Sequence, residues 1–136
     1  RSTLFPYTTL FRSPYRADEW IRTGDLVDNE PNGDLFWCGR KDDMIIRNGV
    51  NIYPVEIEKE LLQIDGIEDV LVSGEEDQLK GQIIVAYVKC KQDYLFSESQ
   101  IRSVLEQVLP RIKMPDKIYA VDSFLYSDMG KKMKIK

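Results

Sequence analysis

The chain has 136 residues, of which 43% are hydrophobic and 31% charged, a balance typical of a soluble globular domain. It contains no histidine, which excludes Ser-His catalysis and histidine-ligated metal sites built from this chain alone. Its formal net charge of −4 argues against nucleic-acid binding, and no apolar run reaches the length of a membrane span. Cys38 and Cys90 lack metal-binding spacing, so we expect buried thiols in a reducing cytoplasm.

Residues 1 to 13 stand apart from the rest of the chain. They resemble, codon by codon, the translation of a common short-read sequencing adapter. A secretory signal would need a longer apolar run and a small-residue cleavage site. We therefore expect this segment to be an artefact that contributes nothing to the fold, and we expect the natural protein to continue upstream.

Short strands around a turn are predicted over residues 14 to 41. Asn29 to Asp34 is dense in turn formers, and Leu26-Val27 and Leu35 to Cys38 flank it, which predicts a β-hairpin. Another strand is predicted over Met44 to Arg47, because Asn48-Gly49 after it is a strong turn signal.

Two amphipathic helices are predicted in the second half. The first begins at Pro54 and ends before Gly66, and the second follows the capping-box pattern Ser97 to Gln100 and stops at Pro110. Their apolar positions recur at helical spacing: Ile57, Leu61 and Ile64 in the first, and Ile101, Val104, Leu105, Val108 and Leu109 in the second.

Three further strands complete the predicted fold. They cover Val70 to Val72, Gln82 to Cys90 and Lys117 to Val121, with a charged loop over Gly74 to Gly81. A polar loop with a short final strand is expected from Ser127 onward. We predict a small α+β domain, in which helices pack on a few-stranded sheet that a short β segment precedes.

Three polar motifs follow one another along the chain. Thr23-Gly24-Asp25 sets a carboxylate beyond a glycine, Gly39 to Asp43 holds Arg40 beside two aspartates, and Gly130-Lys131 sets an ammonium beside a glycine. Glycine lets backbone approach a ligand closely, and a guanidinium fork suits phosphate or ribose oxygens. The alternatives are a plain turn, a surface charge cluster and a solvated basic tail, respectively.

Together these motifs resemble the C-terminal part of the adenylate-forming enzymes, over about residues 15 to 136. That superfamily includes acyl-CoA synthetases, nonribosomal-peptide adenylation domains and beetle luciferases. The resemblance implies that Asp25 and Arg40 bind ATP or AMP and that Asp42 is the hinge between two domains. It also implies that residues 14 to 41 are the C-terminal edge of a large N-terminal adenylation domain and that residues 42 to 136 are the mobile C-terminal domain.

The resemblance extends to two further sites. The run from Asn48 to Glu58 is similar to the family's glycine loop and the helix that follows, which implies that Asn48 and Gly49 face the thiol arm of coenzyme A. Gly130-Lys131 is similar to the terminal motif, which implies Lys131 as the catalytic lysine of adenylation. No metal ligand is implied.

The chain departs from the family pattern at three positions. Many relatives carry a lysine where this chain has Ile46, and the same departure from lysine also occurs in acyl-CoA ligases. Where this chain has Leu125, a proline is usual. Lys132 follows Lys131 directly, so it is an alternative for the catalytic position.

The implied function is that of a fragment of a cytoplasmic ATP-dependent acyl-CoA synthetase, an acid–thiol ligase of fatty acid metabolism. The complete enzyme would use a carboxylic acid, ATP with Mg²⁺, and coenzyme A, and this chain without the missing N-terminal domain would be inactive. A carrier-protein-dependent adenylation domain and a non-catalytic binding module remain alternatives.

Overall fold

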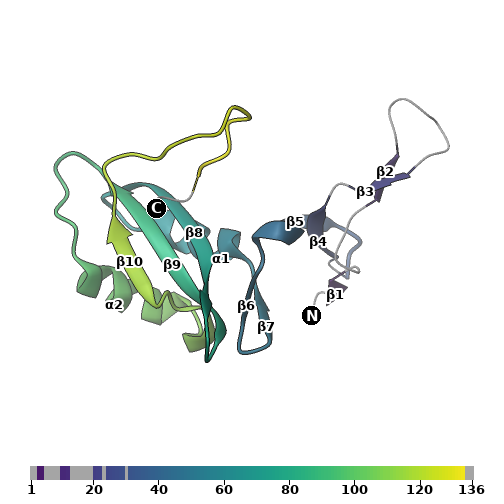
Figure 1. Cartoon of the computed structure of the whole chain (residues 1–136), viewed down its shortest axis with the longest axis horizontal. Helices are drawn as coiled ribbons and strands as arrows, with labels where there is room; N and C mark the ends of the chain where they lie inside the picture. Colours follow the sequence, from purple (N-terminus) through teal and green to yellow (C-terminus); the bar gives the residue numbers. More distant parts are fainter. Residues whose placement is uncertain (1–2, 5–9, 13–19, 23, 30, 134–136) are drawn as a thin grey trace. The chain divides into compact units, whose positions relative to one another are not determined.

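The computed structural model describes residues 3–4, 10–12, 20–22, 24–29 and 31–133 (Figure 1). Most of the adapter-like segment, Thr23 of the first motif and the end of the expected final strand lie outside the described residues. The chain divides into two compact units, Arg1–Met44 and Ile45–Lys136. Among the described residues, no helix has both the length and the apolar composition needed to cross a bilayer.

The first unit consists of short antiparallel strands. The predicted hairpin is confirmed, since β4 (Asp25–Asn29) pairs with β5 (Leu35–Arg40). Two further pairings involve the start of the chain: β1 (Thr3–Leu4) pairs with β4, and β2 (Leu10–Arg12) pairs with β3 (Trp20–Arg22).

These two pairings involve residues of the adapter-like segment, and the expectation that residues 1 to 13 contribute nothing to the fold stays a prediction. An edge strand presents unpaired N–H and C=O groups, to which any extended neighbour can bond. Backbone pairing of this kind depends little on side-chain identity, so it does not bear on the origin of the segment.

The second unit is built on a mixed five-stranded sheet centred on β9 (Gly81–Cys90). β9 pairs antiparallel with β8 (Ile67–Asp77) and β6 (Ile45–Arg47), and parallel with β10 (Lys117–Ala120). β7 (Val50–Ile52) completes the sheet beyond β6. Because two helices pack on this sheet, the predicted α+β class is confirmed.

The loop predicted over Gly74 to Gly81 is wrong for most of its length. β8 continues to Asp77, and Gly74 pairs with Ile84. The turn itself is short, because the Asp77 carboxylate accepts the N–H groups of Leu79 and Lys80 at 3.0 and 2.9 Å. Charged residues and glycines are typical of a loop, but here most of them are strand residues of the long β8–β9 hairpin.

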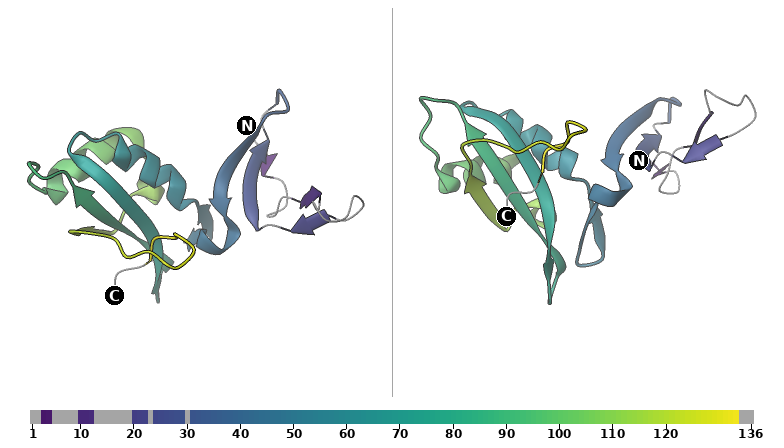
Figure 2. Two further views of the ribbon diagram at one scale, coloured as in Figure 1. Left: turned by 90° about the horizontal axis from the view of Figure 1, so that it is seen from above. Right: turned by 45° about the horizontal axis from the view of Figure 1, so that its top comes forward.

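Both helices lie on one face of the sheet, and the last segment of the chain crosses the other (Figure 2). α1 (Pro54–Leu62) and α2 (Glu98–Val108) begin where the sequence predicted. β9 serves both faces because its side chains alternate. Ile84, Ala86 and Val88 belong to the core that includes helix residues, and Ile83, Val85 and Tyr87 pack with Phe124.

Three details of side-chain environment differ from the prediction. Ser97 precedes α2 without capping it, and its hydroxyl lies 3.2 Å from that of Ser99. Val104 and Val108 of the predicted apolar face are exposed, whereas Ile101 and Leu105 are buried in the core and Leu109 packs against it. Both cysteines are partly exposed thiols, not buried ones, because each stands at or near a strand end, and partial burial raises the pKa of Cys90.

Candidate functional site

Asp25 and Arg40 are brought together across the β4–β5 hairpin. They are register partners, and Arg40 Nη1 lies 3.4 Å from Asp25 Oδ1. The same oxygen accepts from Trp37 Nε1 at 3.3 Å. Gly24, with a positive φ of 78°, starts this arrangement, and its carbonyl accepts the N–H of Lys41 at 2.8 Å. The hairpin thus presents a carboxylate and a partly exposed guanidinium side by side, a pair suited to ribose hydroxyls and phosphate.

Asp42 lies in a single 3₁₀ turn, Lys41–Asp43, directly after β5. Its side chain is exposed, and the boundary between the two compact units follows two residues later, after Met44. A hinge residue must absorb a change of φ and ψ while its side chain stays solvated. The exposure of Asp42 meets the second condition, and its place just before the unit boundary is compatible with the first, so its role as the hinge stays a prediction.

Asn48 and Gly49 form the tight turn of the β6–β7 hairpin. Both have positive φ, 50° for Asn48 and 75° for Gly49. A Cβ built on Gly49 would meet no atom within 4 Å, so the backbone faces open space. A ligand could therefore approach the main chain closely here, as the predicted thiol-arm contact requires.

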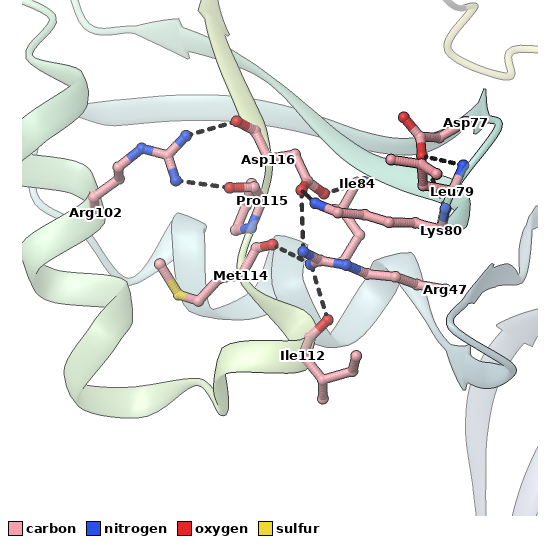
Figure 3. Close-up of polar contacts among 10 residues, drawn as sticks. All are labelled: Arg47, Asp77, Leu79, Lys80, Ile84, Arg102, Ile112, Met114, Pro115 and Asp116. Atoms are coloured by element: carbon pink, nitrogen blue, oxygen red, sulfur yellow. Dashed lines mark hydrogen bonds and ion pairs between the residues drawn. The ribbon is translucent and has the colours of Figure 1, made fainter.

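A cluster around Asp116 holds this turn in place (Figure 3). Asp116 Oδ1 accepts from Arg47 Nη2 at 3.0 Å and from Lys80 Nζ at 2.6 Å, and Oδ2 accepts the N–H of Ile84 at 2.9 Å. Lys80 closes the arrangement, because its carbonyl accepts the N–H of Asn48 at 2.8 Å. The glycine turn is thus tied to the β8–β9 turn through one carboxylate.

Two arginines extend the cluster to the segment before β10. Arg47 Nη1 donates to the carbonyls of Ile112 and Met114 at 3.1 and 2.8 Å, and Arg102 of α2 donates to those of Pro115 and Asp116 at 2.7 and 2.9 Å.

The charge of Asp116 is stabilised in this setting. Partial burial raises the pKa of the carboxyl, but the hydrogen bonds from Lys80 and Ile84 and the charges of Arg47 and Lys80 outweigh burial, so the pKa is lowered. Sequence reasoning missed this residue, because its partners lie far away along the chain and no local pattern marks it.

Lys131 lies in a second tight turn, near the end of the chain. The Ser127 N–H donates to the Lys131 carbonyl at 2.8 Å, and the Lys131 N–H donates to Ser127 Oγ at 3.1 Å. Gly130, with a φ of 80°, makes the reversal possible. Lys131 is an exposed residue, as a lysine that meets anions from outside this unit must be.

Lys132 has a different environment from Lys131. Its ammonium pairs with Asp69 Oδ1, donates to the Val70 carbonyl at 2.9 Å and lies 5.2 Å from the centroid of the Phe124 ring. A lysine engaged this way is poorly placed to bridge two substrate anions. Lys131 as the catalytic lysine stays a prediction, with the less exposed Lys132 as the alternative.

The two turns lie at opposite ends of the β8–β9 hairpin (Figure 1). Lys132 is held beside Asp69 near one end, and Asn48 bonds to Lys80 just past the other end, Asp77. Eight residues of strand at roughly 3.3 Å each separate Asp69 from Asp77 by about 26 Å. A single reacting centre therefore cannot contact both turns at once.

No group of three or more cysteine, aspartate or glutamate side chains that could hold a metal ion occurs in the part of the chain that the structure describes.

Comparisons with known proteins agree with this architecture. Residues 56–131 match the family described as the AMP-binding enzyme C-terminal domain. The 2-succinylbenzoate–CoA ligase of Oceanobacillus iheyensis is 37% identical over 105 residues, which is 77% of this chain and 22% of the ligase. The 3-[(3aS,4S,7aS)-7a-methyl-1,5-dioxo-octahydro-1H-inden-4-yl]propanoyl:CoA ligase of Rhodococcus jostii is 33% identical over 118 residues, covering 87% of this chain and 23% of that ligase.

Solved structures agree as well. Bacillus subtilis o-succinylbenzoate CoA synthetase, in complex with its acyl-adenylate intermediate, has a TM-score of 0.78 at 30% identity, over 85% of this chain and 23% of the other. ATP-bound MatB from Rhodopseudomonas palustris has a TM-score of 0.75 at 32% identity, with the same coverages. This chain thus spans less than a quarter of the length of these relatives, and by its family match it belongs to the AMP-binding enzyme C-terminal domain family.

Proposed function

We propose that this chain is the C-terminal part of an ATP-dependent acyl-CoA synthetase. In the first half-reaction, a carboxylate oxygen attacks the α-phosphorus of ATP, pyrophosphate leaves and an acyl-AMP forms. In the second, the thiolate of coenzyme A attacks the acyl carbon and AMP leaves. The relatives named as CoA ligases support this reaction.

The observation that carries the proposal is that the terminal turn and the Asn48-Gly49 turn are tied to opposite ends of β8, where Asp69 and Asp77 lie about 26 Å apart. If the domain is rigid and carries one functional turn at each end, it must rotate between two orientations for each turn to reach the same reacting centre. Two successive half-reactions at one centre need that arrangement. Asp42, at the junction of the two compact units, is the proposed hinge.

Each end has a chemistry that fits its step. In one orientation, the exposed Lys131 ammonium offsets the charge of the two anions that react, the carboxylate and the α-phosphate. In the other orientation, the open backbone at Asn48 and Gly49 lines the path of the thiol arm. Asp25 and Arg40 hold the ribose and phosphate of the nucleotide in both steps.

Three finer points belong to the same proposal. Magnesium enters bound to the ATP phosphates, and no residue of this chain is assigned to it. The cytoplasm is the proposed location, because Cys38 and Cys90 are thiols, which a reducing compartment preserves. The acid substrate is a carboxylic acid, of which a fatty acid and 2-succinylbenzoate are two candidates. The test below uses 2-succinylbenzoate, the acid for which the ligase that supplies the N-terminal part is named.

The test grafts residues 20 to 136 onto the O. iheyensis ligase in place of its own C-terminal segment. We call this protein the grafted ligase. We expect ATP–pyrophosphate exchange with 2-succinylbenzoate and formation of its CoA thioester. The ligase without any C-terminal segment and the 136-residue chain alone are the controls, and both should be inactive.

Three outcomes would contradict parts of the proposal. A grafted ligase that folds but does no better than the truncated ligase would overturn it. Transfer to a phosphopantetheinyl carrier protein but not to coenzyme A would favour the carrier-dependent alternative. ATP–pyrophosphate exchange by the 136-residue chain alone would show that the chain is active without an N-terminal domain.

A further inference from the structure

We propose that Asp69 and Lys132 are positioning residues for Lys131: their ion pair fixes the terminal turn on β8, and with it the backbone from which the exposed Lys131 side chain extends. The inference rests on the proposed function, in which Lys131 is the catalytic lysine.

The pair is anchored on several sides. The Lys132 ammonium contacts the Asp69 carboxylate and donates to the Val70 carbonyl, so it engages both a side chain and the backbone of β8. Lys132 and Asp69 are each 28% exposed, which makes this a partly desolvated pair. The Asp69 carboxylate also lies 3.5 Å from the hydroxyl of Tyr126, a residue that is the bridge partner of Lys132 across the turn.

An apolar support lies beneath the ammonium. Phe124 is 7% exposed and belongs to the cluster that covers the outer face of β9. Its ring centroid is 5.2 Å from Lys132 Nζ, within the range of a cation–π contact. The ammonium is therefore held between an anion and a ring, and this fixes where Lys132 lies.

The position of Lys132 determines that of Lys131. The two residues are adjacent, so a Lys132 ammonium held on β8 limits where the backbone of Lys131 can lie. The hydrogen bonds between Ser127 and Lys131 hold the backbone at the same point. Without the Asp69 carboxylate, the Lys132 bond to the Val70 carbonyl and the Phe124 contact remain, but the turn loses its charged anchor on β8.

A neighbouring ion pair provides a matched control. Lys89 pairs with Glu68 at 2.7 Å, and Glu68 directly precedes Asp69. Glu68 is 49% exposed, and its partner lies on β9 instead of the terminal turn. Glu68→Gln also replaces one carboxylate of β8 by an amide, but it leaves the ion pair between Asp69 and the terminal turn intact.

The experiment compares four variants of the grafted ligase: Asp69→Asn, Lys132→Asp, the charge swap Asp69→Lys with Lys132→Asp, and Glu68→Gln. The readouts are acyl-AMP formation from acid and ATP, and thioester formation from supplied acyl-AMP. We expect Asp69→Asn and Lys132→Asp each to slow the first step about ten- to hundredfold, because a small misplacement of a reacting group costs that much. The second step should be unchanged, the charge swap should recover most of the loss, and Glu68→Gln should resemble the parent.

A second readout uses the 136-residue chain itself. Amide hydrogen exchange over residues 126 to 133 should be faster in Asp69→Asn and unchanged in Glu68→Gln, with the circular dichroism of both unaltered. Exchange is independent of any activity, so it tests the anchor even where a grafted variant is inactive.

The outcomes separate this inference from the proposed function. Unchanged adenylation and unchanged exchange in Asp69→Asn would overturn the positioning role alone, provided that Lys131→Ala abolishes adenylation. A charge swap that rescues nothing, together with an active Lys131→Ala, would instead make Lys132 the catalytic lysine and overturn both statements.

Discussion

Arg47 and Asp116 form an ion pair of 3.0 Å between residues 69 positions apart in the chain. Each residue is mostly buried, and both belong to the cluster that holds the Asn48-Gly49 turn. The turn that we assign to the thiol arm is therefore shaped by a carboxylate on a distant segment.

Replacement of this carboxylate is the first prediction. Asp116→Asn keeps the size of the side chain but leaves Arg47 and Lys80 without their shared anion. The free energy of unfolding should fall by about 2 kcal/mol, as expected for charged hydrogen bonds in a partly buried site. Urea unfolding of the 136-residue chain measures this loss, and Asn48 amide exchange should be faster.

Glu56→Gln is the control for Asp116→Asn. Glu56 pairs with Lys113 at 2.6 Å, and its side chain is 41% exposed. An exposed pair contributes about 0–1 kcal/mol. Equal losses in the two variants would show that the Asp116 cluster has no special role.

The stabilisation from Asp116 should depend on pH in one direction. Its pKa in the folded chain is lowered, so its contribution is fully present above the unfolded value of about 3.9 and disappears as the pH falls through the folded value. The stability difference between the parent and Asp116→Asn should be constant above about pH 5 and shrink below about pH 4. A difference that instead grows toward acid pH would contradict this account.

The hinge prediction concerns Asp42. Proline fixes φ near −65°, close to the values of a 3₁₀ turn, so Asp42→Pro should trap one of the two orientations. In the grafted ligase we expect acyl-AMP formation to persist and thioester formation from acyl-AMP to be impaired. Asp43→Pro, one residue further on in the same turn, is the comparison. Equal loss of both half-reactions in Asp42→Pro would argue against the hinge.

The catalytic prediction concerns Lys131. Lys131→Ala in the grafted ligase should reduce acyl-AMP formation by about 10²–10³, the usual effect of removing one preorganised charge partner. Thioester formation from supplied acyl-AMP should be largely spared, since the terminal turn and the Asn48-Gly49 turn are tied to opposite ends of β8. Stopped-flow measurement of each half-reaction decides this, and Lys131→Arg tests whether a charge alone is sufficient. If neither Lys131→Ala nor Lys132→Ala has a selective defect, the terminal turn is not catalytic.

The last prediction concerns residues 1 to 13. The core of the second unit comprises residues between Ile45 and Ile118, so deletion of the segment should change the unfolding of that unit by less than about 1 kcal/mol. Thermal unfolding followed by circular dichroism compares the two chains. A larger loss would mean that the pairing of β1 and β2 supports more than the first unit.

The sequence alone was sufficient for features that depend on nearby residues. Helix α1 begins at Pro54 and α2 follows Ser97, because apolar spacing and proline chemistry act within a few residues. The order of the polar motifs was enough to identify the family. The length of β8 was not predictable in the same way, because Glu75 and Glu76 are charged and become strand residues only through pairing with β9.

Only the tertiary structure decided how the candidate site is supported. Asp116 reaches Arg47, and Asp69 reaches Lys132, across more than sixty positions of sequence in each case. Such contacts depend on strand register and on the path of the chain over the sheet, which no local pattern specifies. For the same reason Lys131 and Lys132, adjacent and chemically identical in the sequence, became distinguishable only when the fold engaged one of them with Asp69.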